Sequence, residues 1–209
     1  MNSDIQKLLG KNRKWISKTV AQEPEYFKKY SGPQKPAYLW IGCSDSRVPA
    51  EKIVDANPGE LFIHRNIANM VHQADLNILS VLQYSVEVLQ VKNIIICGHY
   101  ACGGVKASLE TADHGLIDNW IRSIKQIYEE HRDEFDGLAD DEKADLLSKF
   151  NVRRQVYNTA RSSILQKAWA RGQSIAVHGL MYNFHNGQLE DLSCSIASHS
   201  EVPDIYRLH

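Results

Sequence analysis

The chain has 209 residues, a length typical of one domain that buries its own core. Its 24 Lys and Arg residues against 25 Asp and Glu residues give a formal net charge of −1, so no global field attracts nucleic acid or an anionic membrane. The polar start lacks the apolar run of a secretory signal, and no apolar stretch is long enough to span a membrane. We therefore expect a cytoplasmic protein with reduced cysteines.

We expect a single domain over residues 1–209, with a helical arm (1–30), an α/β core (31–192) and a short C-terminal tail (193–209). Residues 5–29 have helical periodicity, and Pro24 stands where a second short helix can begin. The apolar residues of this segment have little sequence nearby to pack on. We therefore expect an arm that docks elsewhere.

The remaining elements alternate between short apolar strands and helices. Strands are predicted at 38–41, 61–64, 93–97 and 174–181, and helices at 50–56, 75–91, 116–147 and 151–171. Gly42 and Gly98 are expected to end the first and third strands. Asn186-Gly187 predicts a hairpin that returns an antiparallel edge strand at 188–192. The pattern indicates an α/β fold, a mostly parallel sheet with an antiparallel edge and flanking helices on both faces.

Two strand ends carry residues of the types that bind metals. Cys43-Ser44-Asp45-Ser46-Arg47 follows one strand, and His99-Tyr100-Ala101-Cys102 follows another. Sites in open α/β sheets form at the carboxyl ends of strands, so Cys43, Asp45, His99 and Cys102 converge if these strands are neighbours. Two thiolates, an imidazole and a carboxylate suit one tetrahedral Zn²⁺. Gly103 and Gly104 allow close backbone approach and the start of a helix.

Asp45 has two competing partners. Arg47 lies two residues further along and can pair with the Asp45 carboxylate through two hydrogen bonds. If Arg47 holds Asp45, a fourth metal position is open to water, whose pKa a zinc ion lowers to about 7. If Asp45 binds the metal instead, the site is closed and purely structural.

The cysteines also allow other interpretations. Cys43 could be a nucleophile activated by Arg47, but a phosphatase-type loop places its Arg six residues after the Cys, and His99 and Cys102 would have no role. Cys97 lies within an apolar strand and is expected in the core, whereas Cys194 receives no role.

These segments resemble the β-class carbonic anhydrases, and the resemblance covers nearly the whole chain. It is carried by Cys43-Ser44-Asp45-Ser46-Arg47-Val48 and by residues 97–104, with further matches at residues 58–62 and 65–69. It implies reversible hydration of carbon dioxide to bicarbonate and a proton by a zinc-bound hydroxide. Cys43, His99 and Cys102 would be zinc ligands, with water or Asp45 fourth, and Asp45 and Arg47 would form the catalytic dyad.

The same resemblance implies a substrate pocket, an assembly and a regulatory site. Gln34, Phe62, Ile67, Tyr84 and Gly103 would bind substrate, with Gln34 projecting across a subunit interface. The family forms dimers, often paired into tetramers, with N-terminal helices around the partner. A bacterial subgroup carries a regulatory bicarbonate site, whose matching residues here are Trp40, Gly42, Val48, Arg65 and Tyr182. In that subgroup, bicarbonate breaks the Asp45–Arg47 pair and Asp45 closes the zinc site.

Two other functions fit the same motifs. Some relatives hydrolyse carbonyl sulfide or carbon disulfide at this kind of site. A non-catalytic zinc-binding module would keep Asp45 on the metal, although such a module has no need of Arg47. The tail at 193–209 is hard to match to the family.

Overall fold

The computed structural model describes residues 2–208 as two compact units, one ending at Lys35 and the other beginning at Pro36. The first unit holds α1 (Ser3–Gln22) and α2 (Tyr26–Lys29). The Asn2 side chain accepts a hydrogen bond from the Asp4 N–H and caps α1, and the Trp15 ring packs edge-on against Phe27 at 5.5 Å. The predicted break near Pro24 is confirmed.

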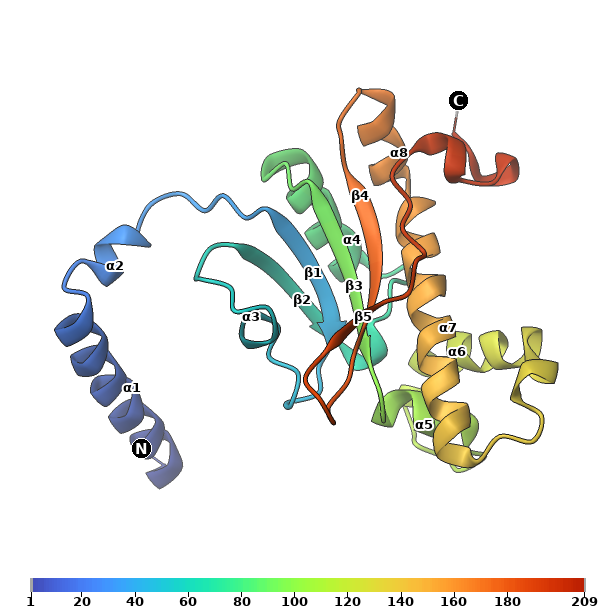
Figure 1. Cartoon of the computed structure of the whole chain (residues 1–209), viewed down its shortest axis with the longest axis horizontal. Helices are drawn as coiled ribbons and strands as arrows, with labels where there is room; N and C mark the ends of the chain where they lie inside the picture. Colours follow the sequence, from blue (N-terminus) through green and yellow to red (C-terminus); the bar gives the residue numbers. More distant parts are fainter. Residues whose placement is uncertain (1, 209) are drawn as a thin grey trace. The chain divides into compact units, whose positions relative to one another are not determined.

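A five-stranded sheet forms the centre of the second unit (Figure 1). Its order is β2-β1-β3-β4-β5; the first four strands are parallel, and β4 pairs antiparallel with β5. The strands are β1 (Tyr38–Cys43), β2 (Leu61–Asn66), β3 (Asn93–His99), β4 (Ala176–Tyr182) and β5 (Leu189–Asp191). The mostly parallel sheet and its antiparallel edge are confirmed. The hairpin closes through the Asn183 N–H bonding to the Gln188 carbonyl and the Gly187 N–H to the Asn183 carbonyl.

Helices and short helical turns connect these strands or follow the last of them. They are α3 (Ala50–Ile53), η1 (Ile67–Asn69), α4 (Leu76–Gln83), the π-helical turn η2 (Tyr84–Val88), α5 (Gly103–Leu109), α6 (Ile117–Glu130), η3 (Arg132–Phe135), α7 (Asp140–Ala160), α8 (Ser163–Ala170), η4 (His199–Glu201) and η5 (Asp204–Tyr206). Within residues 2–208, no helix combines the length and the apolar character that crossing a membrane requires.

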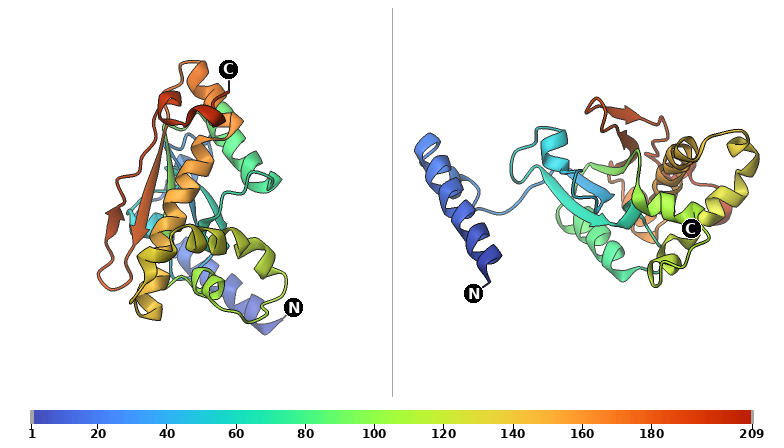
Figure 2. Two further views of the ribbon diagram at one scale, coloured as in Figure 1. Left: turned by 90° about the vertical axis from the view of Figure 1, so that its right-hand side faces the viewer. Right: turned by 90° about the horizontal axis from the view of Figure 1, so that it is seen from below.

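Alternate residues of the strands face two different cores. Leu39, Ile94 and Val177 pack against α4, α7 and α8, which lie on one side of the sheet in Figure 2. The opposite face holds a smaller cluster around Trp40 and Cys97. A third cluster joins Cys43 and Cys102 to Val105 of α5, Ile121 and Ile124 of α6 and other buried side chains. The carboxyl ends of β1 and β3 are thereby embedded in packed helices.

The expectation of helices on both faces of the sheet is only partly right. On the face of Trp40, α3 is the one helix in the described chain that contributes to the cluster, through Ala50. Tyr38 remains 38% exposed, and Ile63, Ile95 and Leu180 are half-buried. Along these strands, the residues that point to one face and those that point to the other are both apolar. The sequence therefore does not show which face of the sheet is less buried.

The predicted ends of the long helices were wrong. The segment 116–147 is interrupted after α6 by η3 and by Gly137, whose φ is +76°. α7 then continues past residue 151 to Ala160. Ser162 caps α8 by accepting a hydrogen bond from the Leu165 N–H. Charged residues obscure the helical period here, and the capping serine decides the break.

The C-terminal tail packs against the rest of the second unit. Ile196 and Val177 exchange two backbone hydrogen bonds, and Val202 is buried. The Gln166 side chain of α8 bonds to the Tyr206 carbonyl and the Leu208 N–H.

Candidate metal centre

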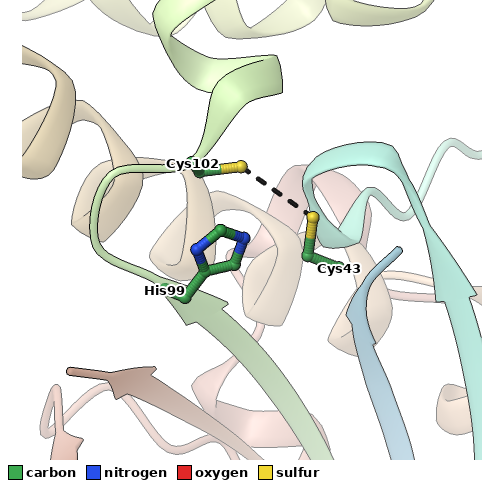
Figure 3. Close-up of side chains that lie close together, drawn as sticks. All are labelled: Cys43, His99 and Cys102. Carbon is green, nitrogen blue, oxygen red and sulfur yellow. Dashed lines mark hydrogen bonds between the residues drawn. The ribbon is translucent and has the colours of Figure 1, made fainter. Parts of the chain in front are cut away.

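Three of the predicted ligands meet at the carboxyl ends of neighbouring strands. Cys43 is the last residue of β1, His99 the last of β3, and Cys102 immediately precedes α5 (Figure 3). One ligand atom from each lies within 4.8 Å of the others, and the two sulfurs are 3.9 Å apart. β1 and β3 pair in parallel with Gly42 opposite Cys97, so the condition for the ligands to converge is met.

The two glycines expected to end the strands lie inside them, which corrects that prediction. A Cβ on Gly98 would lie 2.5 Å from Val152 Cγ2, so a larger residue here would push α7 away from the sheet. A Cβ on Gly42 would lie 2.6 Å from Trp40 Nε1. Glycine therefore permits close packing just before each ligand.

The turn between His99 and Cys102 is held in an unusual conformation. Ala101 has φ +53°, a left-handed value that costs a non-glycine residue about 1 kcal/mol or more. Its N–H donates to Asp145 Oδ1 of α7 at 2.8 Å. A Cβ on Gly104 would lie 2.7 Å from Ile67 Cγ2, so the start of α5 approaches η1 closely.

The His99 ring is oriented as a metal ligand. Its Nδ1 lies 2.9 Å from the Tyr100 carbonyl oxygen, which fixes the proton on Nδ1. Its Nε2 is buried and has no hydrogen-bond partner within residues 2–208. A buried nitrogen lone pair that faces two thiols is costly unless a cation accepts it, so the three side chains fit a thiophilic metal ion.

The two thiols differ in acidity. The hydrogen bond from Cys102 lowers the pKa of Cys43 to about 4, and His99 and the backbone N–H groups of Asp45 and Ala68 act in the same direction. The pKa of Cys102 is raised, because its proton is held by Cys43 and burial disfavours a second negative charge. A divalent cation would remove that penalty and stabilise both thiolates.

Asp45 lies beside this set but pairs with Arg47. The Arg47 Nε and Nη2 atoms donate to Asp45 Oδ1 and Oδ2 at 3.0 and 2.7 Å, and the Arg47 N–H donates to Oδ1 at 2.9 Å. These bonds hold the pKa of Asp45 well below its usual value. Asp45 Oδ2 is 4.0 Å from His99 Nε2. The carboxylate is thus ionised and close to the three ligands, and its role as a fourth ligand stays a prediction.

Two contacts involve the residues that are expected to line the substrate pocket. The rings of Phe62 and Tyr84 pack together at 5.8 Å, and Tyr84 is 43% exposed. Ile67 is 40% exposed in η1 and touches the start of α5, where Gly103 lies. Gln34 belongs to the first unit.

Of the residues expected to bind a regulatory anion, Arg65 and Val48 bond to the backbone of the metal loop. Trp40 and Tyr182 belong to one cluster on the same face of the sheet. Arg65 donates to the carbonyl oxygens of Cys43 and Asp45 at 2.8 and 2.5 Å. Val48 is buried, and its N–H donates to the Asp45 carbonyl.

Comparison with known proteins decides the family. A family model described as carbonic anhydrase matches residues 38–189. The carbonic anhydrase of Emericella nidulans is 39% identical over 204 residues, which cover 97% of this chain and 90% of that protein. The chain belongs to the carbonic anhydrase family.

Solved structures place the chain in the β class. The Coccomyxa β-carbonic anhydrase in complex with acetazolamide matches with a TM-score of 0.90 and 39% identity, over 96% of this chain and 91% of that one. One of two tetrameric β-carbonic anhydrases of Sordaria macrospora matches with a TM-score of 0.88 and 35% identity, over 94% and 100%. The similar relatives are fungal and plant, which corrects the expected bacterial type.

In this β-class carbonic anhydrase, Cys43, His99 and Cys102 form the zinc site, one per chain. Cys97 is fully buried in the core, as expected, and burial raises the pKa of its thiol.

Sequence reasoning missed two residues at this centre. Asp145 holds the Ala101 turn from α7, and nothing distinguishes it among the many acids of its segment. The Phe184 ring contacts both Arg47 and His99. Its place two residues after Tyr182, past the end of β4, could have suggested it.

Proposed function

We propose that this carbonic anhydrase hydrates carbon dioxide with Asp45 and Arg47 as its catalytic dyad. The observation that carries the proposal is that Asp45 is bonded twice to Arg47 while its Oδ2 lies 4.0 Å from His99 Nε2. When bound, zinc supplies Lewis acidity that makes a water molecule acidic near neutral pH.

Asp45 and Arg47 have separate tasks in this proposal. The guanidinium of Arg47 keeps the Asp45 carboxylate ionised and holds it through two hydrogen bonds. The carboxylate is then free to accept a hydrogen bond from the attacking water and to orient its lone pair toward the substrate carbon. A non-catalytic zinc site would have no use for this pair.

We assign substrate binding to Phe62, Ile67, Tyr84, Gly103 and Gln34. Carbon dioxide is uncharged, so apolar walls beside the metal hold it without strong hydrogen bonds. The exposed faces of Ile67 and Tyr84 leave room for a partner subunit to complete the wall, and Gln34 would reach the pocket from that partner.

Assembly with further copies of the chain is part of the proposal. Apolar side chains on one face of α1 are exposed, namely Ile5, Leu8, Leu9, Trp15, Ile16 and Val20. Spacings of three, four and seven residues place them on one side of the helix as an apolar stripe, which Asn12 interrupts between Leu9 and Trp15. We propose that this stripe binds a second copy in a dimer that pairs into a tetramer.

We further propose that bicarbonate and pH regulate this enzyme. Arg65 binds the carbonyl groups of Cys43 and Asp45, and Trp40 and Tyr182 lie on the same face of the sheet, near Gly42. An anion that took over Arg65 would free the Asp45–Val48 loop, and Asp45 could then leave Arg47 for the metal. Low pH would favour that closed form.

Stopped-flow hydration of carbon dioxide from about pH 6 to pH 9, with zinc content measured in parallel, tests the activity. We expect zinc near one per chain and a rate that rises with pH. Zinc near one per chain with no hydration at any pH, or turnover of carbonyl sulfide alone, would overturn the proposed activity.

Regulation is tested with two variants. Tyr182→Phe and Trp40→Phe should each abolish bicarbonate inhibition below neutral pH. A wild type without such inhibition rules the switch out.

A further inference from the structure

Phe184 contacts one member of the proposed dyad, one zinc ligand and the last residue of β4. The Arg47 guanidinium carbon lies 4.4 Å from the centroid of its ring. The His99 ring meets it edge-on at a centroid distance of 5.3 Å and an angle of 69°, and the Tyr182 ring does so at 5.3 Å and 79°. One half-buried aromatic side chain thus joins the dyad, a zinc ligand and the end of β4.

Arg47 needs such a support. Its side chain is 59% exposed, whereas that of Asp45 is 17% exposed. A long exposed side chain loses its geometry to solvent and to rotamer freedom unless something fixes it. The face of an aromatic ring attracts a guanidinium through its quadrupole, and the flat contact limits how the guanidinium can turn.

The ring is itself fixed by the edge hairpin. The backbone of Asn183 exchanges hydrogen bonds with Gln188 and Gly187, and the Asn183 side chain accepts from the His185 N–H. Phe184 therefore projects from a closed turn between β4 and β5. The turn that leads into the antiparallel edge strand thereby places the Phe184 ring beside the metal centre.

We propose that Phe184 is a positioning residue that keeps Arg47 on Asp45 and so keeps the fourth metal position open; this rests on the dyad proposed above. Without the ring face, Arg47 has only the carboxylate to orient it. Asp45 Oδ2, already 4.0 Å from His99 Nε2, then has less to hold it away from the metal position.

The test compares Phe184→Leu, which keeps apolar bulk but loses the ring, with Phe184→Tyr, which keeps the ring face. We expect Phe184→Leu to lower kcat/KM for carbon dioxide about five- to tenfold at neutral pH, with zinc content unchanged. Phe184→Tyr should stay within about twofold of the wild type. Crystal structures of the zinc-loaded variants should show Asp45 displaced from Arg47 in Phe184→Leu and paired in Phe184→Tyr.

Each other outcome has a definite meaning. Full activity of Phe184→Leu, or lost activity with Asp45 still on Arg47, overturns the positioning role. If Phe184→Leu does not fold, Phe184→Met takes its place under the same criteria. If the zinc-loaded wild type is inactive, the proposed function fails, while the position of Asp45 in the variant structures still decides the role of Phe184.

Discussion

The strained turn at Ala101 sets the spacing between His99 and Cys102. A left-handed alanine persists only where its surroundings compensate for it, and here the Asp145 carboxylate accepts its N–H. Asp145 stands on α7, so a helix remote in sequence holds the metal loop in shape.

Replacing Asp145 with Ala should weaken zinc retention, because the Ala101 turn loses its anchor. We expect a loss of about 10- to 100-fold in zinc affinity, measured by competition with a chromogenic chelator. Asp145→Asn, which keeps an acceptor oxygen, is the matched control and should lie close to the wild type. Equal affinities for the Ala variant and the wild type would contradict this role.

Replacing Arg47 with Lys keeps the charge but loses the two-pronged bond to Asp45. Hydrogen bonds to charged groups contribute about 1.5–3 kcal/mol, so kcat/KM should fall about 10- to 100-fold. Stopped-flow assays at saturating zinc measure the change. Zinc content should stay the same, because Arg47 contacts the carboxylate and not the three ligands; a variant as active as the wild type would argue against the dyad.

At the scale of elements, hydrogen bonds join β5 to α7 and to Tyr100 of the metal loop. Glu190 of β5 accepts hydrogen bonds from the Tyr100 hydroxyl and from Lys149 Nζ of α7, the latter at 3.0 Å. The Tyr100 bond first, and Lys149 second, hold the pKa of Glu190 below its ordinary value. The edge strand is therefore anchored to the residue that follows His99.

This anchor should make stability depend on pH in one direction. A carboxyl group whose pKa is lowered on folding stabilises the fold above its unfolded pKa of about 4.3, and that contribution is lost as the pH falls through the folded pKa. Glu190→Gln should therefore lower the free energy of unfolding at pH 7 by less than about 1 kcal/mol, because the pair is partly exposed.

Urea unfolding of the wild type and of Glu190→Gln, at pH 7 and at a pH below about 4, measures the effect. The difference between them should shrink as the pH falls below about 4. Glu129→Gln, at an exposed position of α6, controls for removal of a charge alone. A difference that stayed constant or grew on acidification would contradict the assignment.

At the scale of the whole molecule, the apolar stripe of α1 should govern assembly. The double substitution Leu9→Glu and Ile16→Glu should shift sedimentation at micromolar concentration toward the monomer, because charges would be buried in the proposed interface. Lys11→Glu with Lys18→Glu, on the polar side of α1, is the matched control and should leave the oligomer intact. An unchanged oligomer in the first variant would show that assembly uses another surface.

The sequence by itself determined the candidate zinc ligands and the kind of sheet, mostly parallel with an antiparallel edge. Short apolar strands followed at once by Cys43 and His99 place metal-binding residues at the carboxyl ends of parallel strands, and the ligand types limit the metal. Those inferences depend on local sequence patterns, which are present whether or not the tertiary contacts are known.

Only the tertiary structure showed that Asp45 pairs with Arg47 and which residues support the metal centre. Asp145, Phe184 and Glu190 act across 40 or more residues of sequence, and no local pattern encodes such contacts. The helix breaks at Gly137 and Ser162 have local causes, a left-handed glycine and a capping serine, which the charged residues around them obscure in the sequence. The close approach of Val152 to Gly98 follows from packing. Such contacts depend on which surfaces meet, and that is settled only when the chain is folded.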